Sequence, residues 1–302
     1  MPLLADLAAA LVAGLIAYLG ARWYAQSEDT PARPAKEVAR AAGEAIQHHS
    51  GLRRLLVGRL DRSVATGLLL TIALGVMLVG GVVLGVLAVL VRRVASLQHL
   101  DNSVAAWGFD HRTAWSTSAL RQITNLGSVY AIVVLGVVVV AFDLRRNRTR
   151  WGFLFLLTVM VGNELLTIGL KDLVGRLRPT LNPAAEKLGP SFPSGHSSTS
   201  AAFYASAALL LGRARRPPVR HVQIGAAVAV AVAVASSRVL LDLHWLSDVI
   251  GGLALGWGWF ALCGTAFGGR LLRPTAAVDV AADEALRGRT GRPQAVDRAG
   301  FR

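Results

Sequence analysis

The chain alternates between long apolar stretches and shorter stretches that carry nearly all of its charges. A helix needs about 20 apolar residues to cross the hydrocarbon layer of a membrane. Seven stretches approach or reach this length, at residues 7–21, 64–91, 122–142, 151–170, 196–212, 222–237 and 249–269. Two of them are rich in valine and resemble buried strands, but lipid accepts only helices and closed barrels. The pattern therefore predicts an all-α, polytopic membrane helical bundle.

The first apolar stretch, residues 7–21, is short for a span and follows Asp6 rather than a basic region. A secretory signal normally begins with positive charges, so we interpret the stretch as a membrane helix and keep a cleaved signal as the alternative. The residues from 22 to 63 are rich in arginine and have apolar positions at helical spacing. This combination predicts a basic, amphipathic segment on an anionic membrane surface.

Composition favours a membrane protein and argues against other classes. Of the 302 residues 53% are hydrophobic, and the formal net charge is +14. Because the cations lie between apolar stretches and in the tail, they fit membrane orientation better than nucleic-acid binding, and no nucleic-acid partner is expected. The single cysteine, Cys263, lies in an apolar stretch and leaves neither an internal disulfide nor a cysteine metal site.

The lysines and arginines are unevenly divided between the two sides that the spans create. Segments 22–63, 143–150, 213–221 and 270–302 lie on one side and hold 23 of the 32. The positive-inside rule makes that side cytoplasmic. The segment 92–121 then lies outside, where its tryptophans and mixed polarity predict a cap along the membrane interface.

We accordingly expect three parts. Residues 1–63 would form an N-terminal membrane helix and the basic cytoplasmic segment, and residues 64–268 a core of six spans. Residues 269–302, with glycine, proline and scattered charges, would form a disordered basic tail in the cytoplasm.

A first polar cluster, KDLVGRLRP, lies at the outer end of the fourth predicted span. Lys171, Arg176 and Arg178 stand shortly before Pro179, which would end the helix. Their ordinary interpretation is anchoring at the interface, although anchoring cations are commoner on the inner side. Glu164 lies two turns before Lys171 on the same helical face, and no role is assigned to it.

A second cluster, SFPSGHSS, opens the fifth predicted span. It places Ser194, Gly195 and His196 at a helix N-terminus, where free backbone N–H groups and the helix dipole attract an anion. Taken alone, these residues would favour an ordinary N-cap.

The third cluster, SRVLLDLHWLSD, ends the sixth predicted span. If the chain is helical from Trp245, His244 and Asp248 lie at i and i+4 on one face. The carboxylate can then accept the Nδ1 proton and leave Nε2 free as an acceptor or nucleophile, with Arg238 holding an anion in front of it. The alternative is a structural hydrogen bond at a helix start.

All three clusters lie on the outer side, so they can meet in one site. Three cations, a helix N-terminus and two histidines suit a phosphoryl group and the extra charge of its transition state. No acidic cluster able to hold magnesium accompanies them in the sequence, so the cations take the place of a metal and no cofactor is expected.

The motifs resemble the three signatures of the type 2 phosphatidic acid phosphatase family. They are Lys171-x6-Arg178-Pro179, Pro193-Ser194-Gly195-His196 and Ser237-Arg238-x5-His244-x3-Asp248, in the order and with the spacing of the family. The likeness covers about residues 64–268 and implies a six-helix core with an extracytoplasmic site. Soluble vanadium haloperoxidases share the motifs, but the predicted spans do not suit them.

The resemblance also implies a role for each signature residue. His244 would be the nucleophile that forms a phosphohistidine, and Asp248 would orient it. His196 would protonate the leaving group and then activate water. The phosphoryl oxygens would be bound by Lys171, Arg178, Ser194, Gly195 and Arg238.

The function expected is a membrane lipid phosphatase acting on a lipid phosphate or diphosphate, such as phosphatidic acid, undecaprenyl diphosphate, phosphatidylglycerol phosphate or diacylglycerol pyrophosphate. A lipid phosphotransferase using the same phosphohistidine is an alternative. A transporter is a further one, although the charges lie at helix ends rather than near the midplane. Only three lysines occur, which suggests a GC-rich bacterial genome and thus a bacterial cytoplasmic membrane protein with its site outside. The oligomeric state is left open.

Overall fold

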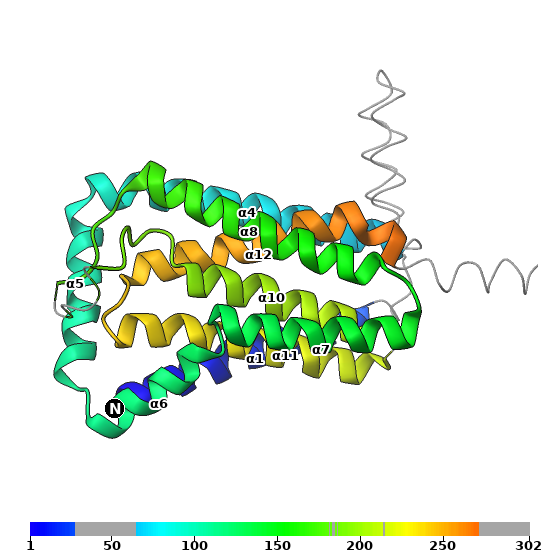
Figure 1. Cartoon of the computed structure of the whole chain (residues 1–302), viewed down its shortest axis with the longest axis horizontal. Helices are drawn as coiled ribbons and strands as arrows, with labels where there is room; N and C mark the ends of the chain where they lie inside the picture. The colour runs from blue at the N-terminus through cyan, green and yellow to red at the C-terminus, as the bar shows by residue number, and fades with distance from the viewer. Residues whose placement is uncertain (28–64, 181, 183–184, 186, 214, 272–302) are drawn as a thin grey trace, which may run out of the picture.

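The computed structural model describes residues 1–27, 65–180, 182, 185, 187–213 and 215–271, and these residues contain α-helices and no β-strand. Most of the helices run along one axis, and α5 lies across one end of the bundle (Figure 1). The prediction of an all-α bundle is confirmed. The helices are α1 (Pro2–Ser27), α4 (Ala65–Arg93), α5 (Ala95–Asp110), α6 (Ala114–Asn125), α7 (Val129–Asn147), α8 (Trp151–Val174), α10 (Gly195–Gly212), α11 (Pro217–Leu240) and α12 (Leu246–Leu271).

Five of the described helices, α1, α4, α8, α11 and α12, are long and apolar enough to cross a membrane. Helices α6 and α7 meet that criterion only together, and they are bent by 46° where they join. The predicted span over 122–142 therefore falls on a bent pair of helices rather than on one helix. Ser128 starts a new helix because its side chain accepts the N–H of Ala131 at 3.3 Å, which caps α7.

Helix α10 forms where the span 196–212 was predicted. It is not among the helices that are apolar enough to cross a membrane, because its first half is rich in serine. It packs against α7, α8, α11 and α12, and Ser198, Ser200 and Ser206 are buried there. Protein rather than lipid surrounds this helix, and the hydroxyls of Ser198 and Ser206 donate to carbonyls of the helix itself, at 3.1 and 2.7 Å.

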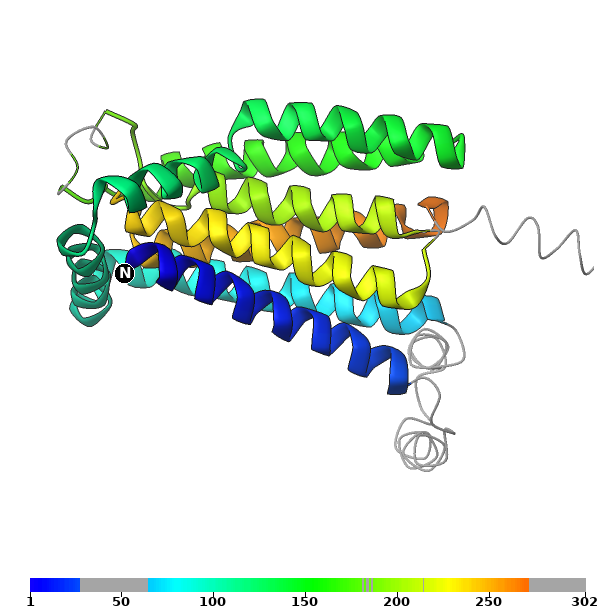
Figure 2. The same cartoon turned by 90° about the horizontal axis from the view of Figure 1, so that it is seen from below.

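Helix α1 lies along α11 in both views (Figures 1 and 2). The two backbones meet at Gly14 and Gly225, where a Cβ on Gly14 would lie 2.8 Å from the carbonyl oxygen of Gly225. The buried Asp6 accepts a hydrogen bond from the hydroxyl of Ser236 on α11. The 26-residue α1 is thus longer than the predicted 7–21 and is fixed to the helix that carries Arg238.

The two ends of the bundle are closed by different parts of the chain. At one end Arg213 forms a buried ion pair with Asp143 and donates to the carbonyl of Leu271 at 3.1 Å, which ties the loop after α10 to α7 and α12. At the other end lie α5 and α6, formed from the predicted cap region 92–121. The predicted amphipathic segment within 22–63 and the predicted tail lie almost wholly outside the described residues.

Candidate active site

The three predicted clusters meet at the end of the bundle that α5 covers (Figure 1). Helices α8 and α11 end there, and α10 and α12 begin there. The backbone N–H of Ser194 donates to the carbonyl of Asp248 at 3.0 Å, and Arg178 lies against His244. Residues from all three motifs are therefore brought into contact, as their common side predicted.

The first motif reaches the site through a loop that closes on itself. Gly175 ends α8 with a φ of +60°, and its N–H donates to the carbonyl of Lys171 at 2.8 Å. The loop returns where Ser191 donates its N–H to the carbonyl of Arg176 at 2.8 Å and its hydroxyl to the carbonyl of Leu177 at 3.1 Å. These contacts fix the short segment that carries Arg178.

His244 is 2% exposed, and Arg178 Nη1 lies 3.0 Å from its Nε2. A guanidinium can only donate, so Nε2 accepts and the ring proton belongs on Nδ1. Nδ1 faces Asp248 Oδ2 at 3.5 Å, a contact that is long for a hydrogen bond, as is common in unliganded sites. Burial lowers the pKa of His244 to about 4, against the opposing effect of Asp248. The ring is thus neutral at physiological pH, with a lone pair on Nε2.

The carboxylate of Asp248 is fully buried and is held from two sides. Its Oδ2 accepts the backbone N–H of Trp245 at 3.0 Å, which caps the start of α12. Its Oδ1 accepts Arg176 Nη1 at 2.6 Å. These bonds keep the carboxylate ionised and fix the oxygen that faces His244.

Lys171, Arg178 and Arg238 make no ion pair with a carboxylate within the described residues, and Arg178 is the one that contacts Nε2. Lys171 Nζ donates to the carbonyl of Pro190 at 2.9 Å, and Arg178 donates to the carbonyls of Gly189 and Leu243 at 2.8 and 2.6 Å. Arg238 donates to the hydroxyl of Thr124 at 3.2 Å, and its buried Nε has no partner within the described part of the chain. Their positive charge is available for an anion.

The start of α10 adds backbone donors to this positive region. Ser194 is the N-cap, but its side chain makes no capping bond and instead accepts the hydroxyl of Ser197 at 2.9 Å. The first N–H groups of the helix, beginning at Gly195, are therefore not taken up by the N-cap side chain. His196 follows, partly exposed and within electrostatic reach of Arg238, His244, Lys171 and Arg178.

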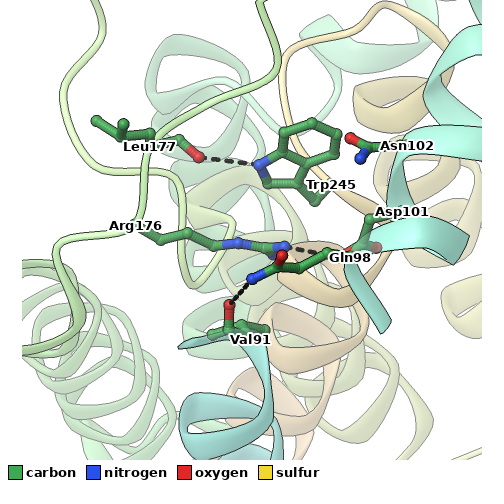
Figure 3. Close-up of a pocket in the computed structure, with 7 residues that line it drawn as sticks. All are labelled: Val91, Gln98, Asp101, Asn102, Arg176, Leu177 and Trp245. Atoms are coloured by element: carbon green, nitrogen blue, oxygen red, sulfur yellow. Dashed lines mark hydrogen bonds and ion pairs between the residues drawn. The ribbon is translucent and has the colours of Figure 1, made fainter. Parts of the chain in front are cut away.

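Sequence reasoning did not find every residue of this region. Arg176 was noted only as one of three cations, yet it bridges Asp248 and Asp101 of α5. Beside it lies a cavity of about 310 Å³ lined by Val91, Gln98, Asp101, Asn102, Arg176, Leu177 and Trp245 (Figure 3). Asp101 and Arg176 are 75 positions apart, so no local pattern relates them.

The described residues contain no group of three or more histidine, cysteine, aspartate or glutamate side chains placed to hold a metal ion. Glu164 is exposed on α8, while Lys171 bonds to the loop carbonyl of Pro190.

Comparison with known proteins decides the family. A model described as the PAP2 superfamily matches residues 152–270. Phosphatidylglycerophosphatase B of Bacillus subtilis is 31% identical over 163 residues, which cover 53% of this chain and 80% of that protein. The chain belongs to the PAP2 superfamily. The resemblance seen in the motifs is confirmed, and the chain is a multi-pass membrane member of this lipid phosphatase family.

Further relatives and a solved structure are also similar to the chain. The lipid A 1-phosphatases of Rhizobium etli and Rhizobium johnstonii are 38% and 37% identical over 122 residues, which are 37% of this chain and slightly under half of those proteins. The crystal structure described as the first transmembrane PAP2 type phosphatidylglycerolphosphate phosphatase, from Bacillus subtilis, has a TM-score of 0.59 and 29% identity. It covers 65% of this chain and 98% of its own.

The close approach of α10 and α12 generates a first prediction. A Cβ on Gly252 would lie 2.6 Å from the carbonyl oxygen of Ser194, so Gly252→Ala should push the start of α10 away from Asp248. We expect lipid phosphate hydrolysis in detergent micelles to fall about 10- to 100-fold, since a misplacement of about 1 Å has that effect. Gly264→Ala on the same helix is the control, because nothing lies within 4 Å of its Cβ position. Equal rates for the two variants would contradict the packing argument.

Proposed function

We propose that this PAP2 protein hydrolyses the terminal phosphate of a membrane lipid through a phosphohistidine on His244, at the extracytoplasmic face. The observation that carries the proposal is the 3.0 Å contact of Arg178 Nη1 with His244 Nε2. It gives the ring the tautomer that a nucleophile needs, and it places a cation where a phosphoryl oxygen would lie during attack.

The reaction would proceed in two displacements. In the first, Nε2 of His244 bonds to phosphorus while the bond to the leaving oxygen breaks and His196 gives that oxygen a proton. In the second, His196 takes a proton from water, the water oxygen bonds to phosphorus, and His244 leaves. Asp248 would stabilise the positive charge on the ring in the phosphorylated state.

The remaining residues of the motifs would bind the phosphoryl oxygens. Lys171, Arg178 and Arg238 donate to neutral partners, so a phosphate dianion would add the attraction between opposite charges that these partners lack. Ser194 and the first N–H groups of α10, beginning at Gly195, would complete the set of donors. Because these groups recognise phosphate alone, the lipid must be selected elsewhere.

The relatives narrow the candidate substrates only to lipids that carry a phosphate. Phosphatidylglycerol phosphate, phosphatidic acid, undecaprenyl diphosphate and diacylglycerol pyrophosphate remain candidates, and the name of the first relative favours the first of them. A lipid A phosphate is added because other relatives are lipid A 1-phosphatases. A test of the proposal is release of inorganic phosphate from this panel in detergent micelles. Absence of release from all members would contradict the proposed function.

A second prediction separates the two histidines. His244→Ala should abolish turnover on every substrate and leave no phosphoenzyme. His196→Ala should lose about 10²- to 10⁴-fold on a lipid monophosphate, whose alkoxide needs a proton, and distinctly less with nitrophenyl phosphate, whose leaving group does not. Single-turnover rates of the first step are the required measurement, because His196 also acts in the second. If both variants lost the same factor on both substrates, His196 would be a binding residue instead.

A third prediction concerns the side on which the site lies. In a background lacking Cys263, a cysteine in place of Thr180 should react with an impermeant thiol reagent in intact cells, and one in place of Arg216 only after lysis. Both positions are exposed, and the positive-inside rule puts them on opposite sides. The reverse labelling pattern would place the site in the cytoplasm.

A further inference from the structure

We propose that Asp101 and Arg176 are positioning residues that act through Asp248 on His244, so that helix α5 is part of the active site. The proposal rests on the proposed role of His244 as nucleophile and adds two residues that the signature motifs do not contain.

The evidence begins with the guanidinium of Arg176, which joins two buried carboxylates. Its Nη1 donates to Asp248 Oδ1 at 2.6 Å, and its Nη2 donates to Asp101 Oδ2 at 2.7 Å. Figure 3 shows the side chain pointing to Asp101 on α5. Asp101 is 1% and Asp248 0% exposed, so water does not screen either ion pair appreciably.

Asp101 also holds the first turn of α12, which is the helix of Asp248. Its Oδ1 accepts the backbone N–H of Ser247 at 3.0 Å, and its Oδ2 accepts the Ser247 hydroxyl at 2.5 Å. A carboxylate supplied by another helix therefore serves as a cap for α12. The residue next to Ser247 is Asp248, so the position of α5 determines where the catalytic carboxylate stands.

Asp101, Arg176 and Asp248 together form a relay of ion pairs that ends at His244. The charges of this relay favour attack by His244. Two carboxylates and one guanidinium leave one net negative charge beside a neutral imidazole. When Nε2 bonds to phosphorus the ring becomes positive while Nδ1 keeps its proton, and the group becomes neutral. Without the charge of Asp101, Arg176 would cancel that of Asp248, and the developing imidazolium would lose much of its stabilisation.

An arginine is required at the centre of the relay. Its planar fork can hold two carboxylates with separate nitrogens, whereas a lysine offers one small charge that cannot span them. Arg176 also lines the 310 Å³ cavity, together with the polar side chains of Gln98 and Asn102. If the side chain were removed, this cavity would let a small cation reach the vacated position.

The first test compares Asp101→Asn with Asp110→Asn, which changes an exposed carboxylate on the same helix. We expect kcat on a lipid phosphate to fall about 10- to 100-fold in the first variant, the range seen when outer partners of a functional histidine are removed. KM should change by less than about threefold, because the phosphate-binding cations are untouched. Asp110→Asn should match the wild type. Thermal stability and the burst of phosphoenzyme report the folded, active fraction of each variant.

The second test asks whether Asp101 acts through Asp248. In an Asp248→Asn background, adding Asp101→Asn should lower kcat by less than about threefold, because the relay then has no catalytic carboxylate to serve. If the two losses instead multiplied, Asp101 would act independently of Asp248 and the relay would be wrong.

The third test is chemical rescue of Arg176→Gly by guanidinium. We expect millimolar guanidinium to restore kcat at least tenfold in this variant and to leave Asp101→Asn unchanged, because a guanidinium alone cannot replace a carboxylate. Should Arg176→Gly fail to fold, Arg176→Lys takes its place, with a fall in kcat and little change in KM expected.

The outcomes distinguish the two proposals. A wild-type protein that hydrolyses no lipid phosphate overturns the proposed function and the relay with it. An active wild type whose Asp101→Asn variant behaves like Asp110→Asn overturns the relay alone. The relay is also overturned if Asp101→Asn only reduces the amount of folded protein, while the remaining active fraction has the kcat of the wild type.

Discussion

The end of the bundle that α5 covers is organised by the need to keep one buried carboxylate charged. Asp248 is inaccessible to water, and a bare carboxylate in such a place would become protonated or destabilise the fold. The compensation comes from the loop after α8 through Arg176, and from the turn before α12 through the N–H of Trp245. The backbone carbonyl of Asp248 in turn accepts the N–H of Ser194, just before α10. The ends of three helices are thus assembled around a single acidic residue.

The same constraint separates two arginines that look alike in the sequence. Arg176 and Arg178 are two positions apart in the non-helical segment that follows α8. They lie at opposite ends of the His244 and Asp248 pair, with Arg176 on the carboxylate and Arg178 on Nε2. The first is neutralised by carboxylates, whereas the second has only carbonyl and imidazole partners. One charge therefore stabilises the protein, and the other stays available for an anion.

Sequence alone was sufficient where a pattern is local. Apolar length predicted the helices, and the spacing of His244 and Asp248 predicted their contact, because both depend on neighbours within a few turns. The break between α6 and α7 was missed because the apolar character continues through Ser128, whose capping bond is invisible in hydropathy. The serine-rich α10 was predicted from the apolar stretch 196–212, although the helix is too polar to be among those that could cross a membrane by themselves. Asp101 was missed because its partners lie on distant segments, and only the fold brings them together.

The contact between Arg178 and His244 also bears on how a substrate would bind. Arg178 donates to the lone pair of His244 Nε2, which is the pair that the proposed attack would require. A phosphate would offer Arg178 anionic oxygens, which attract a guanidinium more strongly than a neutral imidazole nitrogen does. In the proposed mechanism the arginine would then move from the nitrogen to the phosphoryl group and leave the lone pair of Nε2 free to attack. The carbonyls of Gly189 and Leu243 keep the guanidinium nearby during this exchange, so it need move only a short distance.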